Sequence, residues 1–140
     1  MPRTPAQIFA LVLGVSFLAA GVLGFFTSAD FSVGDAVLAP ENRGTLLGLD
    51  VNGWHNVVHV VTGLVALAVV GRYYAARAFA VGIGAVYALV TVLGVLAGDP
   101  GVVLGLVPVN TADNLLHAAV ALLGVVLGLA TPATRAPTTV

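Results

Sequence analysis

The chain has 140 residues, of which 59% are hydrophobic and only 8% are charged. A soluble domain carries charge on about a quarter of its residues, so much of this surface must face lipid rather than water. The net charge of −1 gives no basic field for nucleic acid, and the lack of cysteine excludes disulfides, thiolate metal sites and cysteine nucleophiles. The composition therefore predicts one integral membrane domain over residues 1–140, with the lipid bilayer as its main partner.

Four apolar stretches have the length and composition of membrane-spanning helices. A helix needs roughly 20 mostly apolar residues to cross the hydrocarbon core of a bilayer. Stretches of about this length cover residues 6–26, 53–70, 76–97 and 111–130, and none carries a charge in its central turns. We therefore predict an all-α membrane protein with four transmembrane helices.

The first stretch resembles a secretory signal, but we expect it to be retained. Signal peptides have apolar cores of about 7–15 residues, and this stretch is longer. It also matches the third stretch, because Ala-Gln-Ile-Phe-Ala at 6–10 corresponds to Ala-Arg-Ala-Phe-Ala at 76–80. The same offset pairs Gly14 with Gly84, Phe17 with Tyr87 and Gly24 with Gly94.

The second and fourth stretches open with the same nine-residue motif. Residues 51–59 and residues 109–117 both read Val-Asn-x-x-polar-Asn-apolar-apolar-His. Together with the match between the first and third stretches, this motif predicts two tandem helical hairpins in a parallel repeat, over residues 6–70 and 76–130. Such a repeat has its axis along the membrane normal, unlike the inverted repeats that place many transporter sites at the midplane.

The arginines predict the orientation of the helices. Arg3, Arg72, Arg77 and Arg135 lie on one side of the predicted spans, whereas the other side carries only Arg43 and all six acidic residues. Positive residues favour the cytoplasmic side, so we predict a multi-pass protein of the plasma (inner) membrane with both termini in the cytoplasm. The two motifs then lie in the outer leaflet.

The segments outside the helices give weaker signals. Both outer connections carry a short leucine-rich run, at 46–49 and 104–106, which is too short to span and is expected to lie at the interface or over the helix ends. Residues 131–140 contain two prolines and no periodicity, so we predict a disordered tail.

Two asparagines stand immediately before predicted helices. Asn52 and Asn110 are suited to N-cap positions, because an asparagine side chain accepts a hydrogen bond from a free N–H group of the first turn. Asp113 lies where a capping box has its reciprocal partner, and His55 occupies the same place in the first motif. We interpret these residues as helix starts.

The other polar positions of each motif share one helical face. Asn56 and His59 lie on this face in the second helix, as Asn114 and His117 do in the fourth. The histidines lie about 10 Å below their caps, where polar side chains tend to face other helices. The leading interpretation is a structural polar cluster that fastens the second helix to the fourth, or a docking surface for another membrane protein. Its asparagines are Asn52, Asn56, Asn110 and Asn114.

Two cofactor sites are alternatives to this structural interpretation. His59 and His117 on facing helices match the arrangement of two axial haem ligands, although four short helices leave little room for a porphyrin. His55, His59, His117 and Asp113 supply enough ligands for a divalent metal such as zinc or copper. A proton-linked or quinone-linked role is a further alternative, because histidine titrates near neutral pH. The leading expectation is that no cofactor is bound.

The sequence contains no motif of a common enzyme class. It has no glycine-rich phosphate loop, no Gly-x-Ser-x-Gly elbow and no HExxH signature, so we predict a non-enzymatic protein. No charge or proline interrupts a span, which also disfavours transport. Small residues four positions apart let helices approach closely, either within the chain or in a homodimer. These pairs are Ala10/Gly14, Ala80/Gly84 and Gly124/Gly128.

Three segments of the chain resemble a known family of small four-helix bacterial membrane proteins. They are Arg-Thr-Pro at 3–5, Val-Asn-Gly-Trp-His-Asn-Val-Val-His at 51–59 and Val-Asn-Thr-Ala-Asp-Asn-Leu-Leu-His at 109–117. The family is classified as a domain of unknown function and is common in high-GC Gram-positive bacteria. The resemblance covers nearly the whole chain. It implies a four-helix inner-membrane protein whose signature is the set of Asn and His positions, and it implies no particular activity.

Overall fold

The computed structural model describes residues 2–134 and consists mainly of four α-helices. They are α1 (Pro5–Gly24), α2 (Gly53–Val69), α3 (Tyr73–Ala97) and α4 (Thr111–Ala130). The connection between α1 and α2 contains the 3-10 helix η1 (Gly34–Leu38) and the strands β1 (Gly44–Leu46) and β2 (Leu49–Val51). The connection between α3 and α4 contains β3 (Gly101–Val103) and β4 (Val107–Val109). The four predicted helical stretches are confirmed to within one helical turn.

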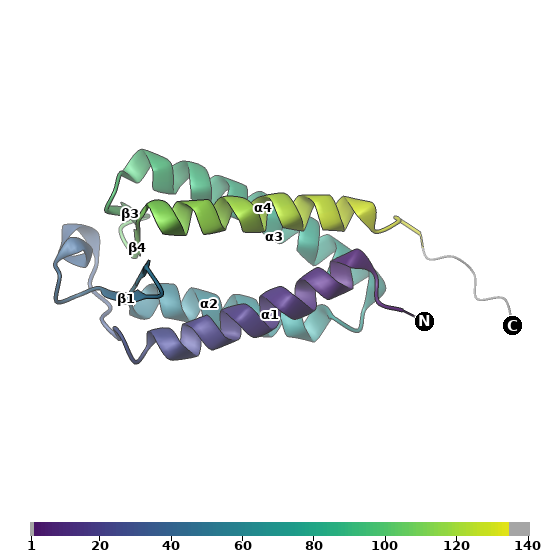
Figure 1. The fold of residues 1–140 in the computed structure, drawn as a ribbon, viewed down its shortest axis with the longest axis horizontal. Coiled ribbons are helices and arrows are strands. Elements are labelled where there is room, and N and C mark those ends of the chain that lie inside the picture. The colour runs from purple at the N-terminus through teal and green to yellow at the C-terminus, as the bar shows by residue number, and fades with distance from the viewer. Residues whose placement is uncertain (1, 135–140) are drawn as a thin grey trace, which may run out of the picture.

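The helices pack as two pairs, α1 with α2 and α3 with α4 (Figure 1). We call α1–α2 the first hairpin and α3–α4 the second hairpin. Contacts of α1 with both α3 and α4 join the two hairpins. All four strands lie at one end of the molecule, which we call the strand end, and α1 begins and α4 ends at the opposite end (Figure 1).

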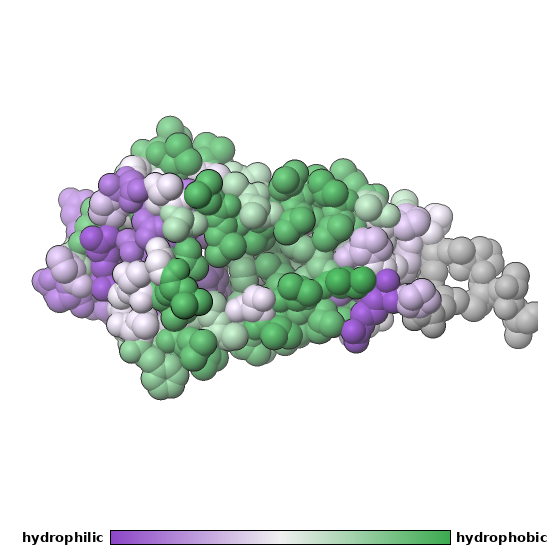
Figure 2. Space-filling view, in the orientation of Figure 1, coloured by the Kyte–Doolittle hydropathy of each residue, from purple (hydrophilic) through white to green (hydrophobic). Residues whose placement is uncertain are grey.

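Three helices, α1, α3 and α4, are long and apolar enough to cross a membrane. Helix α2 has 17 residues and is shorter. At 1.5 Å per residue it extends about 26 Å, against a hydrocarbon core of about 30 Å. Apolar residues cover the middle of the molecule, whereas hydrophilic residues gather at the strand end (Figure 2). Three of the four predicted spans are therefore confirmed as helices long and apolar enough to cross a membrane, as a membrane protein requires.

The core lies where α1 meets the second hairpin. Residues of α1 spaced three or four positions apart fall on one helical face, and this face packs against α3 and α4. The buried cluster consists of Ala6, Phe9, Leu13 and Phe17 of α1, Ala80 and Tyr87 of α3, and Val120 and Ala121 of α4. Phe17 and Tyr87 lie at the end of this core that is nearest the strand end, where their rings contact the motif histidines.

Helices α3 and α4 approach each other closely at Gly84 and Gly124. A Cβ atom on Gly124 would lie 2.7 Å from the Ala80 carbonyl oxygen and 3.0 Å from Gly84 Cα, so a larger residue would force the helices apart. All six members of the predicted small-residue pairs are buried within the chain. They pack the helices of this chain rather than expose a face to a second copy.

The end of α4 is anchored by Thr131, which is fully buried. Its hydroxyl accepts a hydrogen bond from Ala6 N–H and donates to the Leu127 carbonyl, both at 3.0 Å, and Arg77 Nε donates to its carbonyl at 2.9 Å. These bonds tie the end of α4 to α1 and α3 at the first residue of the predicted tail. Residues 135–140 of that predicted tail lie outside the described residues.

Each connection at the strand end contains a two-stranded antiparallel ribbon. In the first ribbon, β1–β2, the turn is formed by Leu47 and Gly48, whose φ angles are 53° and 89°. In the second ribbon, β3–β4, residues 104–106 form the turn. The leucine-rich runs thus form turns over the helix starts, but the strands were not predicted. Three-residue strands leave no alternating pattern, and leucine is an unusual residue at positive φ.

Candidate functional site

The two motif asparagines at the helix starts are N-caps, as predicted. The Asn52 side chain accepts a hydrogen bond from His55 N–H at 2.9 Å, and the Asn110 side chain accepts one from Asp113 N–H at 3.0 Å. Asp113 accepts the reciprocal bond from Asn110 N–H at 3.0 Å, which completes a capping box on α4. These bonds satisfy N–H groups that the helix itself leaves without partners.

Each N-cap side chain also crosses to the opposite hairpin. Asn52 Nδ2 donates to the Leu106 carbonyl at 2.8 Å, and Asn110 Nδ2 donates to the Gly48 carbonyl at 2.9 Å. The start of α2 is therefore bonded to the turn of the second ribbon, and the start of α4 to the turn of the first. The two asparagines fasten the hairpins to each other at the strand end, through the ribbons rather than directly from helix to helix.

Asp50 of β2 is a third point of attachment between the hairpins. Its N–H donates to Asp113 Oδ2 at 2.9 Å, and its carbonyl accepts from His55 Nδ1 at 2.8 Å. A carbonyl can only accept, so this bond places the proton of His55 on Nδ1. The Asp50 carboxylate forms a salt bridge with Arg43 at 2.8 Å. No spacing in the sequence indicated Asp50 or Arg43, because the pairing of β1 with β2 brings them together.

The three histidines lie in one group with two other rings, which we call the aromatic cluster: Phe17, His55, His59, Tyr87 and His117. The His55 ring centroid lies 4.4 Å from that of His59 and 6.2 Å from that of His117. The ring of Phe17 lies 4.6 Å from His59, that of Tyr87 lies 5.2 Å from His117, and Phe17 and Tyr87 are 5.6 Å apart. The structure thus brings together all the histidines that the sequence singled out, with His55 beside both others.

Four buried polar atoms of the motifs lack a hydrogen-bond partner among the described residues. They are Nδ1 of His59 and His117 and Oδ1 of Asn56 and Asn114. A buried polar atom that stays unpaired costs about 1–3 kcal/mol, which makes these four atoms candidates for contacts from outside the described chain. The amide oxygens pack on the backbone of Gly24 and Gly94, where a Cβ atom would overlap them. Cα–H groups make weak hydrogen bonds to such oxygens.

The predicted metal set is only partly assembled. The carboxylate of Asp113 accepts bonds from Asp50 and Asn110, which places it in the cap rather than in the aromatic cluster. Within residues 2–134, no group of three or more His, Cys, Asp or Glu side chains is arranged to hold a metal ion. The described structure gives the metal interpretation no support, and haem ligation by His59 and His117 stays a prediction.

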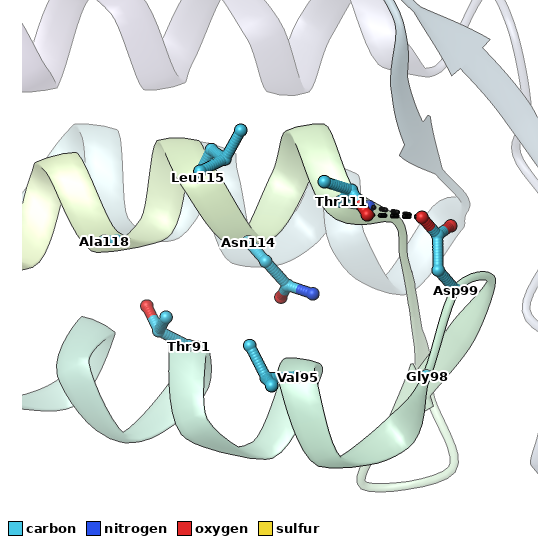
Figure 3. A pocket seen from close by; sticks show the side chains of 8 residues that line it. All are labelled: Thr91, Val95, Gly98, Asp99, Thr111, Asn114, Leu115 and Ala118. Atoms are coloured by element: carbon cyan, nitrogen blue, oxygen red, sulfur yellow. Dashed lines mark hydrogen bonds between the residues drawn. The ribbon is translucent and has the colours of Figure 1, made fainter.

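A pocket of about 350 Å³ lies between the end of α3 and the start of α4 (Figure 3). Its polar side chains include Asp99, Thr111 and the motif residue Asn114. The backbone N–H and the hydroxyl of Thr111 both donate to the Asp99 carboxylate. The sequence had indicated only Asn114, because Thr111 and Asp99 are brought together by the path of the second ribbon.

Comparison with protein-family models matches residues 7–130 to Domain of unknown function (DUF4383). No curated protein and no solved structure matches the chain. The family match covers most of the sequence, including both helix-start motifs, all of α2, α3 and α4, and α1 from its third residue onward. The chain belongs to the DUF4383 family.

Proposed function

We propose that this member of the DUF4383 family is a small non-enzymatic membrane protein whose Asn/His cluster holds two tandem helical hairpins together at their outer ends. The observation that carries the proposal is the pair of reciprocal bonds from Asn52 to Leu106 and from Asn110 to Gly48. Each helix start is thereby fixed to the connection of the other hairpin. The cluster has a structural role, and it presents a fixed outer surface to another membrane component.

Equivalent contacts in the two hairpins support the tandem arrangement. Asn56 packs on Gly24 in the first hairpin as Asn114 packs on Gly94 in the second. The Phe17–His59 contact likewise has its counterpart in the Tyr87–His117 contact. Each of these positions matched its counterpart in the sequence, so one packing scheme accounts for both sets of matches.

Exposed apolar residues support a fourth span at α2. Val58, Val61 and Leu64 are each about half exposed, as expected of side chains that face acyl chains. A span a few ångströms shorter than the hydrocarbon core is accommodated by local thinning of the bilayer. In the proposed topology Arg3, Arg72 and Arg77 face the cytoplasm and the two ribbons face outward.

Cysteine labelling tests this topology, because the natural chain has no cysteine to interfere. Leu104→Cys lies at the tip of the second ribbon and Gly71→Cys in the turn between the hairpins, and both positions are exposed. A membrane-impermeant maleimide added to intact cells is expected to label Leu104→Cys alone and to reach Gly71→Cys only after permeabilisation. The reverse pattern would place the ribbons in the cytoplasm and reject the proposed orientation.

The structural role is tested by removing one reciprocal bond. Asn52→Ala removes both the N-cap and the bond to Leu106, and we expect a loss of about 2 kcal/mol in the free energy of unfolding in detergent micelles. Asn42→Ala is the matched control, because the Asn42 side chain makes only an exposed bond to the nearby Ala36 carbonyl. Equal losses in the two variants would contradict the proposal that Asn52 holds the two hairpins together.

The aromatic cluster favours a second candidate function, a cofactor site at His59 and His117. The specific observation is that three histidine rings converge while Nδ1 of both residues is buried and unpaired. An absorption spectrum of the protein from native-like membranes tests it directly. A Soret band that disappears in both His59→Ala and His117→Ala would establish haem ligation. If the spectrum is featureless and His59→Gln retains most of the stability, only the structural role remains.

A further inference from the structure

The two hairpins differ in one hydrogen bond at the strand end. Asn56 Nδ2 donates to the Ser28 carbonyl at 2.8 Å, and Asn56 is fully buried. Asn114 has the corresponding place in the second hairpin, with its Oδ1 on Gly94. Asn114 Oδ1 is buried without a hydrogen-bond partner among residues 2–134, and its Nδ2 makes no bond to a described residue that would correspond to the bond from Asn56 to Ser28. Asn114 is only partly buried, and Figure 3 shows its side chain directed into the space between α3 and α4.

The difference follows from the segment that leaves each hairpin's first helix. After α1 ends at Gly24, residues 25–31 fold over the start of α2, where Gly53 N–H donates to the Asp30 carbonyl at 2.7 Å. Helix α3 instead continues past Gly94 to Ala97. The first N–H of α4, that of Thr111, then bonds to the Asp99 side chain at 3.3 Å. Within the described chain, no backbone carbonyl is brought to Asn114.

The pocket occupies the corresponding place in the second hairpin. Asp99, Thr111 and Asn114 supply polar lining near the strand end, Val95 lies level with Asn114, and Thr91 and Ala118 line the pocket deeper along the helices (Figure 3). Leu115 of α4 adds to the apolar lining. Val95 is 65% exposed and Leu115 is 68% exposed, so the pocket opens onto a surface that acyl chains cover. It therefore offers one unpaired donor above an apolar lining.

We infer that this pocket binds a membrane glycerolipid, whose ester carbonyl accepts from Asn114 Nδ2 as the Ser28 carbonyl accepts from Asn56. Helix α4 has 20 residues, which at 1.5 Å each matches a hydrocarbon core of about 30 Å. Asn114 lies three residues, about 4.5 Å, inside the helix start. This depth is the boundary between the acyl chains and the headgroups, where glycerol esters lie.

The charge at the pocket mouth selects among glycerolipids. Asp99 is an exposed member of the polar lining, so its carboxylate disfavours a lipid with an anionic headgroup and attracts the ammonium group of phosphatidylethanolamine. The acyl chain of the bound lipid lies along Leu115 and Ala118. The site therefore recognises an ester carbonyl, an apolar chain and a zwitterionic headgroup.

Native mass spectrometry of the full chain with added dioleoyl phosphatidylethanolamine tests the hydrogen bond. The diether analogue of this lipid has the same headgroup and chains but lacks the carbonyl oxygens. We expect the diester lipid to bind about threefold to tenfold more tightly, which is the contribution of one hydrogen bond within a membrane. Asn114→Asp keeps the side-chain shape but replaces the donor by an acceptor, and is expected to abolish this preference. Equal binding of the two lipids to the natural chain would overturn the proposal.

Two neighbouring exposed alanines of α4 provide a matched pair that tests the place of binding. Ala118 lines the pocket and Ala119 does not. Ala118→Phe fills the pocket and is expected to abolish binding of the phosphatidylethanolamine. Ala119→Phe adds the same ring to the helix surface and is expected to leave this binding unchanged. Loss of lipid in neither variant, equal loss in both, or preference for phosphatidylglycerol over phosphatidylethanolamine would each reject a lipid site of this chemistry.

Discussion

In the first hairpin residues 25–31 cover the start of α2 and supply the acceptor for Asn56, whereas in the second hairpin the amide of Asn114 faces a pocket. Deeper in the molecule the two hairpins agree. Both asparagine oxygens pack on a glycine, and both motif histidines lie beside the aromatic ring that their own hairpin contributes. Close packing between helices tolerates little change, whereas surface connections vary freely in length and path.

The helix starts show a second difference, in the residue three positions after each N-cap. His55 and Asp113 occupy this position, and both bond to the backbone of Asp50. His55 donates to the carbonyl and Asp113 accepts from the N–H, so one residue of β2 is bonded to both helix starts. The two motifs therefore use different chemistry at the same place to hold a single strand.

The largest expected effect comes from Asp113. Asp113→Ala leaves the N–H groups of Asp50 and Asn110 unpaired, and bonds to a charged group contribute about 1.5–3 kcal/mol each. We expect a loss of about 3 kcal/mol in the free energy of unfolding, measured by titration with a denaturing detergent. His55→Gln is expected to cost about 1 kcal/mol, because an amide N–H can still donate to the Asp50 carbonyl. A greater loss in His55→Gln would mean that His55 is the more important attachment of β2.

The sequence predicted those parts of the molecule that depend on local patterns. The length of the apolar stretches predicted the helices, and an asparagine just before an apolar stretch predicted the N-caps at Asn52 and Asn110. The bonds between hairpins depend instead on where distant segments meet. Nothing near Asn52 in the sequence indicates that its second partner is Leu106. The sequence shows that Gly24 and Gly94 are matching positions. Only the structure shows that the side-chain oxygens of Asn56 and Asn114 pack against them.

Alanine at Gly24 is expected to destabilise the protein more than alanine at Gly94 does. Both losses are expected to be smaller than the loss in Asp113→Ala. In Gly24→Ala the new Cβ overlaps Asn56 Oδ1, and Asn56 is buried and bonded to Ser28, so it has no space into which to move. We expect a net loss of about 2 kcal/mol from this overpacking. In Gly94→Ala the side chain of Asn114 can turn toward the pocket, and the expected loss is below about 1 kcal/mol.

Gly82→Ala is the control for these two variants, because a Cβ there meets nothing within 4 Å. Alanine favours the helix over glycine by up to about 1 kcal/mol, so the control is expected to be neutral or stabilised. The effects are compared by titration with a denaturing detergent. Equal losses in Gly24→Ala and Gly94→Ala would show that Asn114 is held as firmly as Asn56, which would contradict the contrast between a covered and an open helix start.

The smallest expected effect is at the aromatic pair, where the first hairpin has Phe17 and the second has Tyr87. Tyr87 is 4% exposed, and among the described residues its only hydrogen bond to a side chain is made by its backbone carbonyl, which accepts from Thr91. Tyr87→Phe makes the second hairpin like the first at this position and keeps the ring contacts with Phe17 and His117. Because no bond within the chain is lost, the free energy of unfolding is expected to change by less than about 0.5 kcal/mol.

The same substitution also distinguishes two explanations of the tyrosine. If the hydroxyl serves only the packing of this chain, the variant unfolds like the natural protein both in detergent and in lipid nanodiscs. A loss above about 1 kcal/mol that occurs only in nanodiscs would mean that the hydroxyl bonds to a molecule supplied by the membrane. The difference between Phe17 and Tyr87 would then reflect a polar contact with the membrane that the first hairpin does not make.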